Sequence, residues 1–171
     1  KRECGKKKPF FIYPLTLALR KGNIYKSDKN YDCDKLRKAE LLTEEDKKMT
    51  EVEIDGHLYI GYITIPAVQL ELPVMSSWSY PKLNIAPCRY TGSVRGEDLV
   101  LMAHNYKSHF GPISKLKIGD EVFFADMDGN TTAYEVVGKD VLDPTAVEVM
   151  TSGEYDLTLF TCTYGGANRV T

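Results

Sequence analysis

The feature that most constrains the fold is a succession of short β-rich runs, separated by turns, that begins after Val52. Some runs alternate apolar with polar residues and others are short and wholly apolar, which are the two patterns of sheet strands. Asp128-Gly129 is a hairpin signal between two of them, and Pro66 marks a strand end or a bulge. The runs lie at residues 57–74, 98–104, 121–125, 132–140 and 155–164. With little helix after Thr50, this pattern predicts a mainly β fold closed, or nearly closed, into a barrel.

The first 50 residues lack the succession of β-rich runs, and we expect them to form an N-terminal extension to a domain spanning residues 51–171. A polar linker leads into residues 34–50, which are rich in helix formers and predict a helical lead-in with Asp34 as N-cap. Residues 9–19 are apolar and flanked by basic residues. These residues are too few to cross a bilayer, which requires about 20. They are expected to be either the remnant of a membrane anchor or a strand or short helix docked on the domain.

Composition narrows the classes of function. A length of 171 residues suits one domain with an appendage, and a net charge of −2 gives no basis for a nucleic-acid partner. The four cysteines are widely spaced and form no C-x-x-C pair, so a zinc site or a thioredoxin-like motif is not expected. A disulfide between Cys4 and Cys33 is compatible with the sequence but not required by it.

Cys162 ends the apolar run "LTLFTC" and is followed by two glycines and Arg169. A free cysteine at a strand end is most often a core thiol. A nucleophilic cysteine needs a thiolate, a proton donor and a group that holds the oxyanion. An unassisted thiol is only a few per cent ionised at neutral pH, so a nearby histidine and arginine would assist it. Cys88 follows a proline in a turn-like segment and is interpreted as structural.

Three histidines compete for the role of proton donor. His104 is the best candidate because it ends an apolar run and begins a polar loop, where catalytic residues tend to lie. His57 enters a strand from a turn and is interpreted as a surface residue, while His109 is a weaker candidate in the same loop as His104. Each residue alone has an ordinary structural explanation, whereas the combination of histidine, cysteine and arginine indicates a site.

This combination resembles the sortases, the cysteine transpeptidases of Gram-positive cell walls. "LTLFTC" is similar to the family's Thr-Leu-x-Thr-Cys signature, and "LVLMAHN" is similar to the strand that carries the sortase histidine, with His104 58 residues before Cys162. Arg169 takes the place of the family's arginine in the next strand. The resemblance covers the chain from about Asp55 onward and implies a closed sortase-type barrel of about seven or eight strands with short helices.

The resemblance also implies a reaction, namely cleavage of an LPxTG-like sorting signal between Thr and Gly and transfer of the acyl part to an amine. Cys162 would form a thioacyl-enzyme, and His104, as an imidazolium, would protonate the leaving amine and then deprotonate the incoming one. Arg169 would hold the scissile region or the oxyanion. The segment "PTAVEVM" resembles the class A loop that closes over the signal. The expected substrate contacts are Asn105, Pro144, Thr145, Val147 and Thr161.

The partners implied are secreted proteins with a C-terminal sorting signal, and a peptidoglycan precursor or a pilin amine as acceptor. The implied place is the extracellular face of the membrane of a Gram-positive bacterium, held by an N-terminal anchor. No cofactor and no metal are expected, since Glu97, Asp98 and Asp120 are interpreted as solvated loop residues.

Two questions stay open at this point. The first is the sortase subclass. The short stretch at 143–154 is typical of sortases of classes A, D and E, whereas "HNYKSHFGPISKLKIGD" looks more like class B. A catalytically silent barrel that binds cell-wall or pilus proteins, with Cys162 as a core thiol, is the second hypothesis. A papain-like hydrolase is excluded, because its cysteine would precede its histidine and lie on a helix.

Overall fold

The computed structural model describes residues 14–21, 43, 45, 47–142, 148, 151 and 154–162. The strands are β1 (Pro14–Lys21), β2 (Val52–Ile54), β3 (His57–Ile65), β4 (Leu70–Met75), β5 (Cys88–Thr91), β6 (Leu99–Met102), β7 (Glu121–Asp126), β8 (Thr131–Val141) and β9 (Leu157–Cys162). The helical elements are the α-helix α2 (Tyr80–Leu83) and the 3-10 helices η1 (Pro66–Val68) and η2 (Gly111–Lys115).

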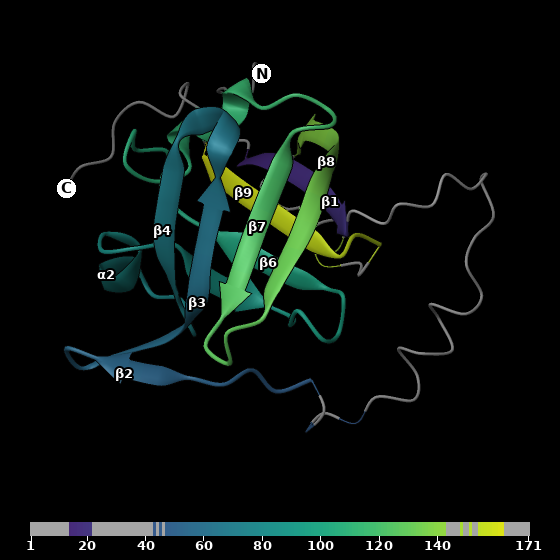
Figure 1. Ribbon diagram of the computed structural model, residues 1–171. Coiled ribbons are helices and arrows are strands. Elements are labelled where there is room, and N and C mark those ends of the chain that lie inside the picture. The colour runs from purple at the N-terminus through teal and green to yellow at the C-terminus, as the bar shows by residue number, and fades with distance from the viewer. Residues whose placement is uncertain are drawn as a thin grey trace, which may run out of the picture.

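The strands form one closed sheet (Figure 1). Its order is β3-β4-β5-β6-β9-β1-β8-β7, and β7 pairs back onto β3, so these eight strands complete a barrel. β2 pairs only with β3 and lies outside the ring. The predicted closed barrel of about seven or eight strands is therefore confirmed.

The expected strand signals correspond to observed elements. The run at 57–74 is divided into β3 and β4 by η1, which begins at Pro66, so the proline does end a strand. The hairpin between β7 and β8 turns where predicted, with Gly129 at a φ of 86°. The Asp126 carboxylate accepts hydrogen bonds from the backbone N–H of Asp128 (3.0 Å) and of Asn130 (2.8 Å), which holds the turn.

Alternation along each strand fills the barrel with apolar side chains. In β3, Ile63 and Ile65 are buried, whereas Tyr62 is exposed and Thr64 is only partly buried. The same pattern in the other strands brings large side chains such as Phe124 of β7 and Leu19 of β1 into one cluster. At about 25 cal/mol per Å² of apolar surface removed from water, this cluster is the main favourable contribution to folding.

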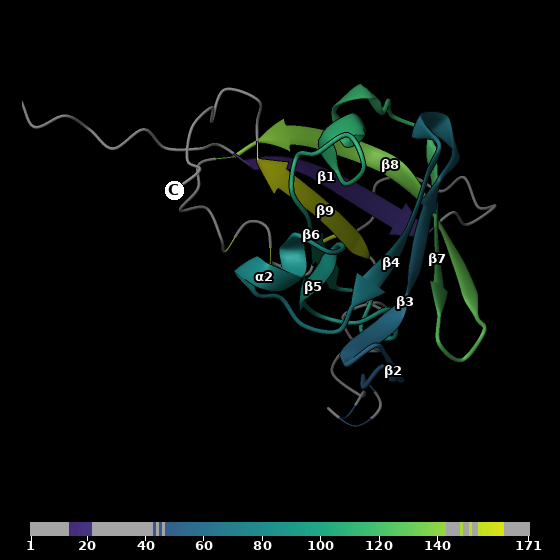
Figure 2. The ribbon, with the colours of Figure 1, turned by 90° about the vertical axis from the view of Figure 1, so that its left-hand side faces the viewer.

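β1 lies between β9 and β8 and is antiparallel to both (Figure 2). Its residues belong to the range 1–50 that the sequence assigned to an extension, yet they form a full strand of the barrel. The docking-strand interpretation of residues 9–19 anticipated a strand, but the local pattern does not reveal its partners, which lie at 134–141 and 157–162.

Most of the helix expected at 34–50 lies outside the described residues. Residues 47–50 form a turn and irregular backbone, so the expected helix does not extend to residue 50. In the part of the chain that is described, no helix is long and apolar enough to span a membrane.

Gly61 allows the barrel to close. It pairs with Asp126 across the β3–β7 seam at a φ of 152°, next to a register shift in the β3–β4 pairing. A Cβ at this position would collide with the carbonyl oxygen of Ala125 and crowd the ring of Phe124. Only glycine lets the two backbones approach this closely.

We therefore expect Gly61→Ala to lower the free energy of unfolding by about 2–3 kcal/mol, because the methyl group must push β7 away from β3. Equilibrium urea denaturation measures this loss. The control is Gly129→Ala, where an added Cβ meets no atom within 4 Å and only the positive φ opposes it, at about 1 kcal/mol. Equal losses in the two variants would contradict a steric role for Gly61.

Candidate active site

Two parallel strands bring the predicted histidine and cysteine together. β6 and β9 are neighbours in a constant register, from Leu99 opposite Leu157 to Met102 opposite Phe160. Beyond the last pair, the Ala103 N–H donates to the carbonyl oxygen of Phe160 (3.3 Å).

The next residue of each strand keeps the register. The Thr161 hydroxyl donates to the carbonyl oxygen of Ala103 (2.9 Å). The two strands are therefore still hydrogen-bonded at the residues that directly precede His104 and Cys162. Because parallel strands lie about 4.8 Å apart, His104 and Cys162 stand side by side at the carboxyl ends of adjacent strands.

The strands that carry the two residues are fixed by the barrel core. Leu99 and Leu101 of β6, and Leu157 and Leu159 of β9, are fully buried in the central cluster. Side chains alternate along a strand, so Met102 and Phe160 are only partly buried and belong to the other face of the sheet. Residues at the ends of these two strands are therefore held in place by the packing of the barrel core.

β9 also has a neighbour on its other side. β1 pairs with it from Leu19 opposite Leu157 to Pro14 opposite Cys162. Arg169, which was predicted to lie in the strand next to the cysteine, is outside the described residues, and the strand that the structure has in this place is β1.

His104 is partly buried, and burial lowers its pKa because the charged imidazolium loses solvation. Its ring stacks on that of Tyr106, with centroids 4.8 Å apart and planes inclined by 29°. Its carbonyl oxygen accepts a hydrogen bond from the Phe110 N–H (3.0 Å), which folds the following loop back on the strand end.

The other predicted substrate contacts have different outcomes. Pro144, Thr145 and Val147 lie outside the described residues, and their role stays a prediction. Asn105 is half-buried directly beyond His104. Thr161 is only 3% exposed, and its hydroxyl bonds Ala103, so it connects the two strands of the site.

Cys88 provides a contrast with Cys162. It is a free cysteine, fully buried in a second cluster beside Leu83 and Ala86, which agrees with its structural interpretation. Burial raises the pKa of its thiol to about 11, although the charge of Lys82 opposes the effect. At neutral pH this thiol is protonated and a poor nucleophile.

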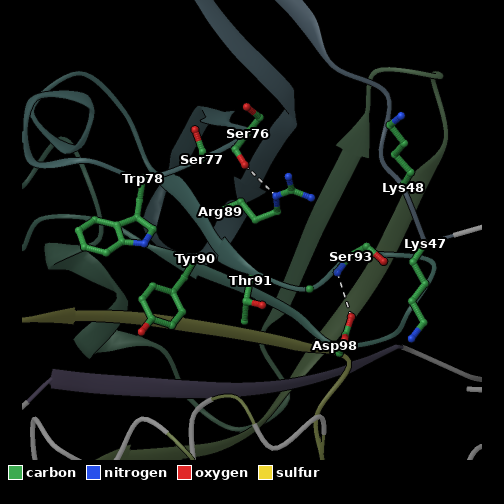
Figure 3. A pocket seen from close by; sticks show the side chains of 11 residues that line it. Lys47, Lys48, Ser76, Ser77, Trp78, Arg89, Tyr90, Thr91, Ser93 and Asp98 are labelled. Atoms are coloured by element: carbon green, nitrogen blue, oxygen red, sulfur yellow. Dashed lines mark hydrogen bonds between the residues drawn. The ribbon is translucent and has the colours of Figure 1, made fainter. Parts of the chain in front are cut away.

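Sequence reasoning missed a pocket of about 490 Å³ on β5 and the adjacent loops. Figure 3 shows Trp78 and Tyr90 at one side of it, Lys47 and Lys48 at the other, and Arg89 between them. Arg89 is held in place, since its Nε donates to the carbonyl oxygen of Ser76 (2.7 Å).

An aromatic contact joins this pocket to the strand of the cysteine. Trp78 stacks on Tyr90 with ring centroids 6.0 Å apart, and Tyr90 meets the ring of Phe160 edge-on at 5.5 Å. Phe160 lies two residues before Cys162. The paired aromatics in "SSWSY" and "PCRY" are the sequence signal that could have indicated this path.

No group of three or more His, Cys, Asp or Glu within the described residues could hold a metal ion.

Comparisons with known proteins agree with the resemblance. The sortase-domain family profile matches residues 63–171. Sortase A of Bacillus anthracis is 31% identical over 137 residues, which covers 77% of this chain and 62% of that protein. The chain therefore spans less than two thirds of the length of this relative.

Solved structures show the same likeness. Sortase C1 from Streptococcus suis superposes with a TM-score of 0.54 at 28% identity. The match covers 76% of this chain and 69% of the Streptococcus suis chain. Sortase C from Clostridium perfringens SM101 gives a TM-score of 0.55 over 79% of this chain and 81% of its own, at 23% identity, and supports the fold alone.

The hydrogen bond of Thr161 generates a prediction. Thr161→Val keeps the shape of the side chain but removes the donor to the Ala103 carbonyl, and we expect the free energy of unfolding to fall by about 1–2 kcal/mol. Thr161→Ser, which retains the hydroxyl, should keep most of this bond energy. Chemical denaturation compares them, and a valine variant as stable as the wild type would show that the bond does not hold β6 and β9 together.

Proposed function

The chain belongs to the sortase family, and on that premise we propose that it is a cysteine transpeptidase with Cys162 as nucleophile and His104 as general acid and base. One observation carries the proposal. The two residues that match the family's signatures, His104 and Cys162, are far apart along the chain, but the register of β6 and β9 leads to neighbouring positions at the ends of these strands.

His104 and Cys162 are 58 positions apart in the sequence, and Ala103 and Thr161, which share a hydrogen bond, are separated by the same 58 positions. The offset that pairs β6 with β9 is thus the offset between the two residues of the site. A catalytically silent barrel gives no reason for a histidine and a cysteine to stand at matching positions at the ends of adjacent strands.

The proposed reaction has two transfers. The Cys162 thiolate attacks the Thr carbonyl of an LPxTG-like signal, and the resulting tetrahedral intermediate expels the glycine amine, which takes a proton from the His104 imidazolium. An incoming amine then loses a proton to the neutral imidazole and attacks the thioester. The new amide forms, and the Cys162 thiolate leaves. Arg169 is proposed to hold the scissile region or the oxyanion by charge-assisted hydrogen bonds.

The ionisation of His104 matters for this cycle because the first transfer needs the imidazolium. Burial lowers the pKa of His104 and so opposes this form. A thiolate at the facing position of β9 would act in the opposite direction, since a neighbouring negative charge favours the protonated imidazole. The pair is therefore expected to titrate together rather than as two independent groups.

The substrate and its acceptor are further parts of the proposal. The signal would be bound by Asn105, Thr161 and the loop residues Pro144, Thr145 and Val147. The pocket beside β5 is proposed to extend this binding surface, because Tyr90 joins it to Phe160 on the nucleophile strand.

The substrates proposed are secreted proteins that carry a C-terminal sorting signal. The acceptor would be a peptidoglycan precursor or a pilin amine, and the enzyme would act at the extracellular face of the membrane of a Gram-positive bacterium. These proposals follow from family membership.

The first experiment is mass spectrometry of the protein after incubation with LPxTG-like peptides and triglycine. We expect an acyl adduct on Cys162, release of the peptide's C-terminal fragment, and a triglycine product. Cys162→Ala should form no product, and His104→Ala and Arg169→Ala should lose about 10²- to 10⁴-fold in rate.

The matched control is Cys88→Ala, which removes the thiol whose pKa burial raises and should leave the rate nearly unchanged. A folded Cys162→Ala protein that still produces the triglycine product would refute the assigned nucleophile.

A second prediction concerns the pocket. Trp78 is 42% exposed and stacks on Tyr90, so Trp78→Ala removes an aromatic surface beside the proposed binding groove. We expect KM for the peptide to rise about two- to tenfold with little change in kcat. Tyr62→Ala, which removes an aromatic ring with 46% exposure from β3, is the control. An unchanged KM in Trp78→Ala would remove the pocket from the binding surface.

A further inference from the structure

The loop after β6 brings the rings of two histidines into contact with that of Tyr106. The Tyr106 ring centroid lies 4.8 Å from that of His104 and 5.5 Å from that of His109. The plane of the Tyr106 ring is inclined by 29° to that of His104, which is a stacked contact, and by 37° to that of His109, which is a tilted one. The tyrosine is nevertheless 49% exposed, so burial of apolar surface explains only part of its placement.

Backbone hydrogen bonds hold this arrangement. The carbonyl oxygen of Tyr106 accepts from the N–H groups of His109 and Gly111, both at 3.0 Å. The Phe110 N–H donates to the carbonyl oxygen of His104, and the Phe110 side chain is fully buried in the barrel core. The loop is thus anchored next to the site, and Tyr106 has little freedom to leave the His104 ring.

His109 is the second histidine in contact with the tyrosine ring. It is 6% exposed, and its Nδ1 atom has no hydrogen-bond partner within the described residues. Burial and then the charge of His104 lower its pKa, while a backbone hydrogen bond to Ile85 opposes them. A neutral His109 places an uncharged ring against Tyr106 rather than a second positive charge near His104.

The face of an aromatic ring carries negative electrostatic potential and attracts a cation placed over it. A stacked tyrosine therefore stabilises an imidazolium more than a neutral imidazole. This interaction acts in the direction that the transfer reaction requires, because the leaving amine must receive a proton from His104.

We propose that Tyr106 is a positioning residue for His104, whose ring face fixes the imidazole at the strand end and favours its protonated form, with His109 as its buried support. The inference rests on the proposed function, in which His104 delivers the proton. It adds a residue that makes no bond to the reacting atoms and acts through His104.

Other ionisable groups surround His104 and must be kept constant in a test. On its own loop these are Tyr106 and His109, and from β9 the facing residue is Cys162. The lysines of the same segment, Lys107 and Lys115, are exposed. A substitution of Tyr106 leaves His109, Cys162 and the two lysines in place.

The test is an NMR titration of the His104 ring in the whole chain without substrate, with the signal assigned by its loss in His104→Gln. We expect Tyr106→Leu to lower the pKa of His104 by about 0.5, the size of an exposed cation–π interaction. Tyr106→Phe retains the ring face and should keep the wild-type pKa. Tyr62→Leu, which removes an equally exposed tyrosine from β3, should have no effect.

Kinetics give the second readout. A pKa lower by about 0.5 leaves about threefold less imidazolium at a pH well above that pKa, and no less at a pH below it. The rate constant kcat of Tyr106→Leu should therefore fall about threefold at high pH while KM stays constant, and Tyr106→Phe should restore it.

An unchanged His104 pKa in Tyr106→Leu would overturn the inference, and so would a Phe variant that behaves like the Leu variant. Because the titration needs no substrate, it decides the inference even if no peptide is turned over. Absence of turnover in the wild-type protein would instead count against the proposed function.

Discussion

The parallel pairing of β6 with β9 is the constraint on which the site depends. Four residue pairs, from Leu99–Leu157 to Met102–Phe160, keep one register, and hydrogen bonds of Ala103 and Thr161 extend it to the strand ends. A slip of one residue would turn each buried leucine to the other face, so the core and the site share one alignment. The packing energy of the barrel thereby fixes the relative position of two residues that are far apart in sequence.

That alignment relies on closure of the whole ring. The β3–β7 seam requires the bare backbone of Gly61, and β1 fills the place between β9 and β8. Strands at an edge have unsatisfied backbone groups and more freedom to shift, whereas each strand of this ring has a paired neighbour on both sides, although β4 and β5 meet only at Met75 and Cys88. The stiffness of the support at His104 is a property of the complete barrel.

Much of this could be predicted from the sequence because it is encoded locally. Alternation in residues 57–65, Pro66 and Asp128-Gly129 indicate strands and turns through backbone preferences of those residues. His104 and Cys162 were identified by a family pattern. The role of β1 was not, because its partners are remote in sequence and local hydropathy does not encode pairing. The stacking of Tyr106 was missed for a similar reason, since ring geometry depends on how the bond from Phe110 to His104 folds the loop back on the strand end.

The place of β1 has a consequence for how a peptide can be recognised. Many proteins bind extended peptides by letting them join an open sheet edge, where main-chain hydrogen bonds supply the affinity. Here β9 has β6 on one side and β1 on the other, with Pro14 opposite Cys162. While β1 keeps this position, a peptide cannot extend the sheet at β9. A peptide substrate of the proposed kind would have to lie across the face of the sheet and be selected by side chains and loops.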